Sequence, residues 1–441
     1  MGPSRSALAE DRAAAEPAVA LAGAAPDAVA APAGRSRRGN LSYLLVFAAA
    51  AAGAGLGRTV VTTYLPLLME RAGGSKGLIG SAMLISAFAG FLVPLVVGHW
   101  SDRTHDQARG RRPFMVGGAL IATLGLAALC LGSLLPFAVL TLFGAVAYLG
   151  IDTVRTAHRA LVHDNFEREG HTRGTGAQEA AQLGGALLGL ALGGGLVGLA
   201  DWAPFLLGAL VTPVLCWVTI RRVAVREVRT TQHVGLPLSF YLRATFRAGV
   251  RAILFAEVLW VLGYAALPVF FIIYAKNELG MGPGVASLWL AIFAVLSGIV
   301  MLLSGRVTRP GRHKGLLALG VLLMGLGFLG VAISHALVWV SLTLILSAVG
   351  FGLISTLGFA LFASLIPRGE AGGYTALYFS VRAIASAVAL PIVGWTIEIT
   401  DSYRALFWFA GVATLVALVP LAFAPRADGR RPWGARLHLT D

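Results

Sequence analysis

Seven charged side chains lie within long apolar runs of this sequence, where an ionised group needs a partner or water. They are Arg58, Asp152, Arg155, Arg159, Glu179, Glu257 and Arg382. A charge at the centre of a lipid bilayer costs at least about 2.5–3.5 kcal/mol, so an intramembrane ionisable residue indicates a functional site. We interpret the seven as a proton-coupling and ion-pair network. The alternative is a permanent ion-pair network that only lets polar helices pack.

Three of these residues, Asp152, Arg155 and Arg159, are spaced by three and four positions. That spacing places them on one face of a helix. Neighbouring arginines favour an ionised carboxylate and burial favours a neutral one, so a carboxyl group here could exchange a proton. The hypothesis is that Asp152, or Glu179 on the next apolar run, binds the coupled proton and exchanges arginine partners.

Several aromatic and amide side chains lie near these charges in the sequence. Aromatic rings can stack on a sugar or another amphipathic ligand, although many such rings serve as packing or interface anchors. The candidate substrate-binding residues are Tyr64, Tyr148, Gln178, Gln182, Trp260 and Tyr264.

The composition defines the elements that must position these side chains. The chain is 57% hydrophobic and 13% charged, with a mean hydropathy of +0.78. A run of about 20 apolar residues crosses a bilayer as a helix, because lipid offers no hydrogen-bond partner to an open backbone. The sequence predicts twelve spans, at 40–69, 77–99, 113–134, 137–163, 175–200, 203–220, 250–275, 284–304, 315–334, 337–364, 372–397 and 403–424.

The basic residues predict the orientation of these spans. Of the 35 Lys and Arg residues, 27 fall in the two tails, in the loops after even-numbered spans or, for Arg251, at the start of the seventh span. The positive-inside rule then puts both termini in the cytoplasm of a plasma (inner) membrane protein. The net charge of +14 is explained by this topology, so we expect no nucleic-acid partner.

The longest loop, 221–249, divides the spans into two groups of six, and similar basic loops follow spans 2 and 8. This repetition predicts a duplicated architecture. The expected organisation is a disordered cytoplasmic tail (1–39), an N-terminal six-helix bundle (40–220), a cytoplasmic linker (221–249), a C-terminal six-helix bundle (250–425) and a second cytoplasmic tail (426–441).

The loop after span 2 carries the most specific motif. It reads Gly98-His-Trp-Ser-Asp102-Arg103 and, after six residues, Gly110-Arg111-Arg112. This pattern resembles the loop signature of the major facilitator superfamily. More narrowly, it resembles the glycoside–pentoside–hexuronide:cation symporters and the sucrose–proton symporters, as do Arg159-Ala-Leu-Val-His-Asp164 and Thr63-Tyr-Leu-Pro-Leu-Leu68.

The resemblance implies an all-α membrane protein with twelve helices in two pseudo-symmetric six-helix bundles. It also implies that spans 1, 4, 7 and 10 line a central cavity. It assigns a cytoplasmic gate to the loop, formed by Gly98, Asp102, Arg103, Gly110, Arg111 and Arg112. The alternative is that these arginines only fix the topology.

The resulting functional hypothesis is proton-coupled symport of a sugar or glycoside by alternating access. A proton-driven exporter of a drug-like or secondary metabolite, and a non-transporting membrane scaffold, are the alternatives, and sodium could replace the proton. No nucleotide-binding Gly-x-x-x-x-Gly-Lys-Ser/Thr motif occurs, which argues against an ATP-driven pump. We expect no enzymatic activity, no cofactor or metal, and a monomer whose partners are the bilayer, the substrate and protons.

Overall fold

The computed structural model describes residues 41–102, 111–166, 171–223, 238–307, 312–366 and 370–425. The chain divides into two compact units, Met1–Leu44 and Leu45–Asp441, and of the described helices all but the first turn of α2 belong to the second unit. The predicted tails, 1–39 and 426–441, lie outside the described residues.

The described elements are all helical. They are α2 (Leu41–Arg71), α3 (Lys76–Asp102), α4 (Arg112–Leu129), η2 (Gly132–Leu134), α5 (Phe137–Asn165), α6 (His171–Val197), α7 (Ala203–Arg222), α8 (Leu238–Phe246), α9 (Ala248–Tyr264), α10 (Leu267–Leu279), α11 (Pro283–Val307), α12 (His313–Ile333), α13 (Leu337–Ala363), α14 (Ala371–Thr400), α15 (Ala405–Val416) and α16 (Leu418–Phe423).

Eleven helical segments among the described residues are long and apolar enough to cross a membrane. They match eleven of the predicted spans. The remaining predicted span, 77–99, coincides with α3, of which the shorter stretch Lys76–Ile85 is an apolar helix. The prediction of an all-helical membrane protein is therefore confirmed, with eleven of the twelve predicted spans meeting the length and hydropathy of a membrane helix.

Two of the predicted spans are each interrupted once, and proline explains both breaks. A proline ring clashes with the carbonyl group four residues earlier and has no N–H to donate. Pro268 lies four residues after Tyr264, where α9 ends, and Pro420 lies four residues after Val416, where α15 ends. The seventh span therefore consists of α9 and α10, and the twelfth of α15 and α16.

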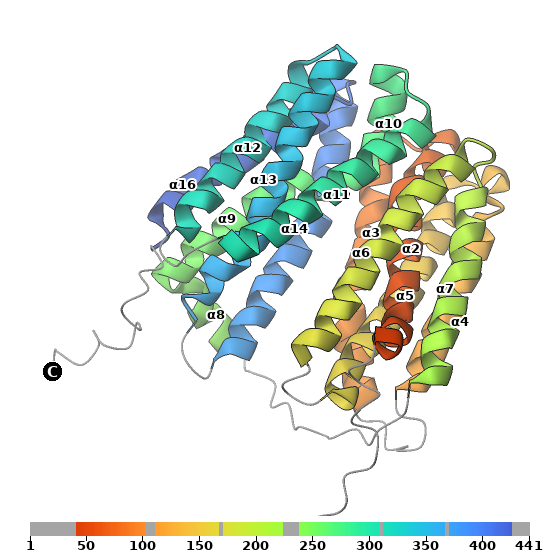
Figure 1. Cartoon of the computed structure of the whole chain (residues 1–441). Helices are drawn as coiled ribbons and strands as arrows, with labels where there is room; N and C mark the ends of the chain where they lie inside the picture. Colours follow the sequence, from red (N-terminus) through yellow and green to blue (C-terminus); the bar gives the residue numbers. More distant parts are fainter. Residues whose placement is uncertain are drawn as a thin grey trace, which may run out of the picture. The chain divides into compact units, whose positions relative to one another are not determined.

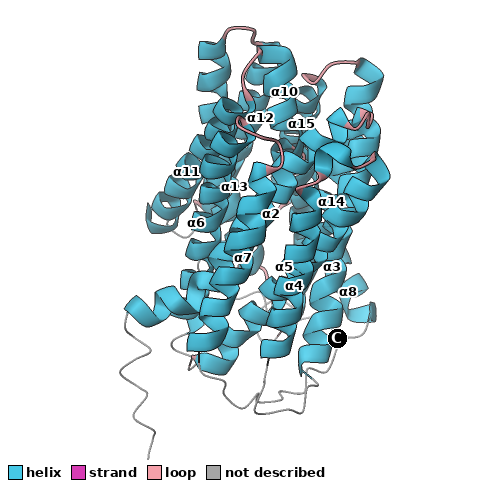
Figure 2. Ribbon diagram, turned by 90° about the vertical axis from the view of Figure 1, so that its right-hand side faces the viewer, coloured by secondary structure: helices cyan, strands magenta, loops and turns pink. Residues whose placement is uncertain are grey.

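The first and seventh spans are the most enclosed. In the most apolar part of Leu41–Arg71 and of Gly249–Leu279, 67% of the residues are buried, against 33–50% in the other spans. The two groups of six spans meet along two helix pairs, since α3 packs on α14 and α6 packs on α11 (Figures 1 and 2). The division into two bundles remains a prediction.

One helix was not predicted from the sequence. The linker 221–249 contains α8, a nine-residue helix that packs on α9 and α14. Its exposed residues include Arg243 and Phe246. An eight- or nine-residue mixed polar segment has too weak a hydrophobic pattern to be distinguished from a loop.

Two adjacent glycines of α6 provide a test of this packing. A Cβ on Gly185 would overlap the backbone of Ala52 in α2, whereas a Cβ on Gly184 would meet nothing within 4 Å. We expect Gly185→Ala to lower the free energy of unfolding by about 1–3 kcal/mol, the cost of overpacking. The matched control, Gly184→Ala, should be neutral or stabilising by up to about 1 kcal/mol because alanine favours helix. Thermal unfolding of the purified protein in detergent measures both, and equal effects would contradict the packing of α6 on α2.

Candidate transport site

An ion-pair cluster joins the first and fourth spans. Nη1 of Arg58 in α2 lies 2.8 Å from both carboxylate oxygens of Asp152 in α5. Nη1 of Arg155, one turn further along α5, lies 2.8 Å from Oδ1 of the same carboxylate. The Asp152 side chain is 2% exposed, while those of Arg58 and Arg155 are 34% and 20% exposed. One buried carboxylate is thus held by two guanidinium groups, and the cluster carries one excess positive charge.

Neighbouring polar groups fix the position of Arg58. Its guanidinium lies 5.2 Å from the centre of the Tyr148 ring, a cation–π geometry. The Tyr148 hydroxyl lies 2.5 Å from the Thr62 hydroxyl, which also donates to the Arg58 carbonyl oxygen at 2.8 Å. Tyr148, predicted to bind substrate, therefore supports the ion-pair cluster.

The third residue of the predicted face, Arg159, forms a different kind of pair. Nη2 of Arg159 lies 2.7 Å from Oε1 of Glu179 in α6, and both side chains are 53% exposed. Gln178, the neighbour of Glu179, is buried and donates to the His158 carbonyl oxygen at 2.7 Å. The structure thus uses Gln178 to join α5 to α6.

A second buried carboxylate lies in the seventh span. Oε2 of Glu257 in α9 accepts a hydrogen bond of 2.5 Å from the Tyr378 hydroxyl of α14. Oε1 has no hydrogen bond of standard geometry among the described residues, and the nearest cation, Nη1 of Arg382, is 3.9 Å away. The Glu257 side chain is 1% exposed and that of Arg382 is 31% exposed. Compared with Asp152, this carboxylate has weaker ionic support.

The predicted aromatic and amide residues separate into two groups. Tyr64 and Trp260 are almost fully buried. The Tyr64 hydroxyl lies 3.1 Å from the Leu190 carbonyl oxygen of α6 and 3.1 Å from the Ser287 hydroxyl of α11. Tyr264 is partly buried, packs edge-on against Phe351, and lies with its ring centre 5.9 Å from the Arg382 guanidinium. Tyr264 and Gln182 keep partial exposure, which substrate contact requires.

The predicted gate is described only in part. Arg103 and Gly110 lie outside the described residues, and Gly98 and Asp102 fall at the end of α3, where only the backbone is described. Arg111 is 7% exposed. Arg112, the first residue of α4, donates from Nη2 to the Val223 carbonyl oxygen at 3.0 Å, which ties α4 to the end of α7.

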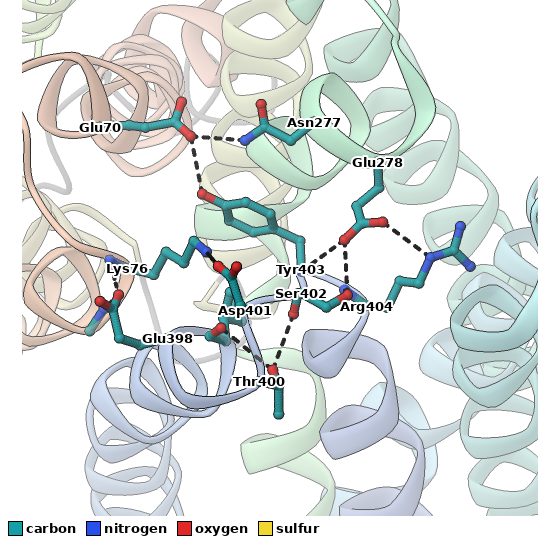
Figure 3. Close-up of polar contacts among 12 residues, drawn as sticks. Glu70, Lys76, Asn277, Glu278, Glu398, Thr400, Asp401, Ser402, Tyr403 and Arg404 are labelled. Atoms are coloured by element: carbon teal, nitrogen blue, oxygen red, sulfur yellow. Dashed lines mark hydrogen bonds and ion pairs between the residues drawn. The ribbon is translucent and has the colours of Figure 1, made fainter.

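A set of polar residues that the sequence analysis did not single out joins the two groups of spans at one end (Figure 3). We call it the polar clasp, and it consists of Glu70, Lys76, Lys276, Asn277, Glu398, Asp401 and Tyr403. The Glu70 carboxylate at the end of α2 accepts hydrogen bonds from Asn277 at 2.9 Å, Tyr403 at 3.0 Å and Lys276 at 3.1 Å. A carboxylate of the first span is thereby bound from the seventh and twelfth spans.

The second part of the clasp holds the start of α3. Oε2 of Glu398, near the end of α14, accepts from the Lys76 backbone N–H at 2.7 Å and from the Gly77 N–H at 3.3 Å. The first backbone N–H groups of a helix have no partner within it, so a carboxylate there acts as a cap. Nζ of Lys76 lies 2.5 Å from Oδ1 of Asp401. A carboxylate of the last six spans thus caps the N-terminus of a helix of the first six.

The protonation states in the clasp follow from these contacts. The hydrogen bond from Lys76 and its positive charge hold the pKa of Asp401 below its ordinary value. Burial, followed by the nearby Glu70 carboxylate, raises the pKa of Tyr403. At neutral pH Asp401 is ionised and Tyr403 is a hydrogen-bond donor, and the Lys76–Asp401 attraction is lost only as pH falls through the lowered pKa of Asp401.

Comparisons with known proteins come from a family model and from solved structures. The model described as Major Facilitator Superfamily matches residues 47–390 and 253–438. A bacterial homolog of the human lysosomal transporter Spinster, in an inward-facing and occupied conformation, is similar with a TM-score of 0.70 and 11% identity, over 86% of this chain and 95% of that one. A D-xylose-proton symporter has a TM-score of 0.69 and 15% identity, over 89% and 99%. A POT family transporter in complex with a thioalcohol-conjugated peptide has a TM-score of 0.67 and 15% identity, over 87% and 96%. None of the curated proteins matches the chain.

The cluster around Asp152 predicts a large effect on stability. Asp152→Asn would leave two arginines without their counter-charge, and breaking a buried ion pair from one side costs about 3–5 kcal/mol. The exposed pair gives the matched control, because Glu179→Gln should cost less than about 1 kcal/mol. Thermal unfolding in detergent compares them. Similar small losses in both variants would contradict the role of Asp152 as the counter-charge of Arg58 and Arg155.

Proposed function

Since the chain belongs to the Major Facilitator Superfamily and is a membrane transporter, not an enzyme, we propose that it couples proton entry to uptake of a sugar or glycoside. The transport would proceed by alternating access, in which the two groups of six spans open first to one side of the membrane and then to the other. The coupling requires a carboxyl group that gains and loses a proton during the cycle.

The observation that carries this proposal is the unequal support of the two buried carboxylates. Asp152 has two guanidinium groups at 2.8 Å, and protonating it would leave both without a partner. Glu257 has one guanidinium group, whose Nη1 lies 3.9 Å from Oε1, and Oε1 accepts no hydrogen bond within the described residues. Neutralising Glu257 therefore sacrifices less ion pairing, and we assign the exchanged proton to it in preference to the sequence-based candidates Asp152 and Glu179.

The proposed orientation has both termini in the cytoplasm of the plasma (inner) membrane. It is supported by the 27 basic residues of 35 in the tails, in the loops after even-numbered spans and at the start of the seventh span. The polar clasp then faces the outside, because it lies at the loops after spans 1, 7 and 11. We take the contacts of the clasp as the bonds that hold that side closed in the proposed cycle.

The substrate class rests on two supports. The resemblance of the loop after span 2 to sugar symporters is one, and the similarity to a D-xylose-proton symporter is the other. The partly exposed groups Arg58, Tyr264 and Arg382 carry donors and a ring face that suit a polyhydroxylated ring. We propose these residues, with Gln182, as the substrate contacts. Export of a secondary metabolite on the same fold is the competing function.

Transport assays in vesicles of defined orientation decide between uptake and export. A screen of sugars and amphipathic metabolites for thermal stabilisation of the purified protein first supplies a ligand. In proteoliposomes with an acidic exterior, a symporter accumulates that ligand, and in everted membrane vesicles acidified inside by respiration it does not. Accumulation by everted vesicles would instead indicate an exporter.

Glu257→Gln should separate proton coupling from substrate movement. The amide cannot carry the proton, so we expect proton-driven accumulation to fall by at least about tenfold, as expected for loss of an essential coupling step. Exchange of labelled for unlabelled ligand at equal pH should persist. Glu179→Gln, on an exposed pair, is the control and should accumulate ligand normally. Normal accumulation by Glu257→Gln would refute the assignment.

A further inference from the structure

Helix α14 takes part in two contacts that lie at different heights of the molecule. Tyr378 and Arg382, one helical turn apart, face Glu257 of α9. Glu398, five turns from Tyr378, and Asp401, which follows the helix, hold Lys76 at the start of α3. One continuous helix, Ala371–Thr400, therefore connects a buried carboxylate with the contact between the two groups of spans.

We infer that α14 couples the protonation of Glu257 to the polar clasp, so that proton binding at Glu257 favours opening of the clasp end. The inference rests on the proposed proton coupling and adds the element that carries it. When Glu257 is ionised, Tyr378 and Arg382 draw α14 toward α9. When Glu257 is neutral, Arg382 has lost its counter-charge in an apolar region and gains by moving toward water.

The surroundings of Glu257 leave α14 as the responding element. The charged and titratable groups that face the carboxylate from the described residues are Arg382 and Tyr378 of α14, with Tyr264 and Trp260 from its own helix as polar neighbours. α13 presents Gly358, which has no side chain to respond. Helices α8, α15 and α16 also pack on α9, but none of their described residues is a charged neighbour of Glu257. A change in the charge of Glu257 is therefore felt mainly by α14.

The far end of α14 is built so that a small displacement matters. A Cβ on Gly80 of α3 would overlap the Leu390 carbonyl oxygen of α14, so the two backbones touch. Pro391 lies between Arg382 and Glu398 and removes one backbone hydrogen bond, which lets the last turns of α14 change their angle. Withdrawal of Glu398 would leave the first N–H groups of α3 without their cap. A small displacement of the end of α14 would therefore break its contact with the start of α3.

Distance measurements between spin labels test this coupling. Leu134 and Val338 lie at the clasp end in different groups of spans, and they are 80% and 68% exposed. Labels attached after Leu134→Cys and Val338→Cys, on a Cys130→Ala background, report the open and closed populations. From pH 8 to pH 5 we expect the ratio of open to closed to rise about tenfold, within the range of coupled sites.

Variants of the two contact regions then distinguish the outcomes. Glu257→Gln should remain largely open at both pH values, and Tyr378→Phe should shift the response toward alkaline pH because a donor to the carboxylate is lost. Glu398→Ala should raise the open ratio about fivefold at every pH by removing the cap. The matched control is Asp201→Asn, since Asp201 pairs with Arg71 within the first six spans, and it should leave the response unchanged.

Two results would overturn the inference. If the open-to-closed ratio of Glu257→Gln and of Tyr378→Phe depends on pH as it does in the parent protein, α14 does not respond to the charge of Glu257. This conclusion would hold even where uptake remains proton-driven. If Asp201→Asn opens the clasp end as much as Glu398→Ala, the contact with α3 is not the responding element. If the parent protein shows no proton-driven uptake, the proposed function itself is wrong, and this result is distinct from the other two.

Discussion

The cost of placing ionised groups among apolar helices is the constraint on which this structure depends. Each buried carboxylate must be held by a cation or be able to become neutral. Asp152 is held by cations, with two arginines at 2.8 Å. Glu257 can become neutral at a smaller cost than Asp152, because Arg382 is 3.9 Å away and Tyr378 is a neutral donor. The same physical rule thus distinguishes a carboxylate with two close counter-charges from one with a single, more distant counter-charge.

The two ion pairs lie on the most enclosed spans, the first and the seventh, and they differ in which helices supply the partners. Arg58 lies on the first span and Glu257 on the seventh, so in each group of six spans the most enclosed helix carries a member of a buried ion pair. The partners come from α5 in one group and α14 in the other. Only α14 also contacts the opposite group, through α3. Glu257, the carboxylate with the weaker ionic support, is therefore located beside a helix that contacts both groups of spans, and Asp152 is not.

The sequence allowed much of the fold to be predicted and rather less of the site. Hydropathy alone located the spans, because the bilayer requires long apolar helices whatever their packing. The breaks after Tyr264 and Val416 could also have been foreseen from Pro268 and Pro420. The spacing of Asp152 and Arg155 indicated a shared face, but their pairing with Arg58, 94 residues from Asp152, depends on tertiary contacts. The clasp residues lie at helix ends, where charges are ordinary, and therefore gave no signal.

Reciprocity between two coupled sites determines which way such a device would move protons. If protonation of Glu257 favours an open clasp end, an open clasp end must also favour protonation, by the same factor. With that end outside, the carboxyl group would bind a proton from the exterior, and closure would weaken its hold before the opposite side opens. The proton would then leave into the cytoplasm, which is the sequence of events that proton-driven uptake requires. Were the clasp end cytoplasmic, the same contacts would load protons from the wrong side, so the proposed orientation and the proposed direction of transport stand or fall together.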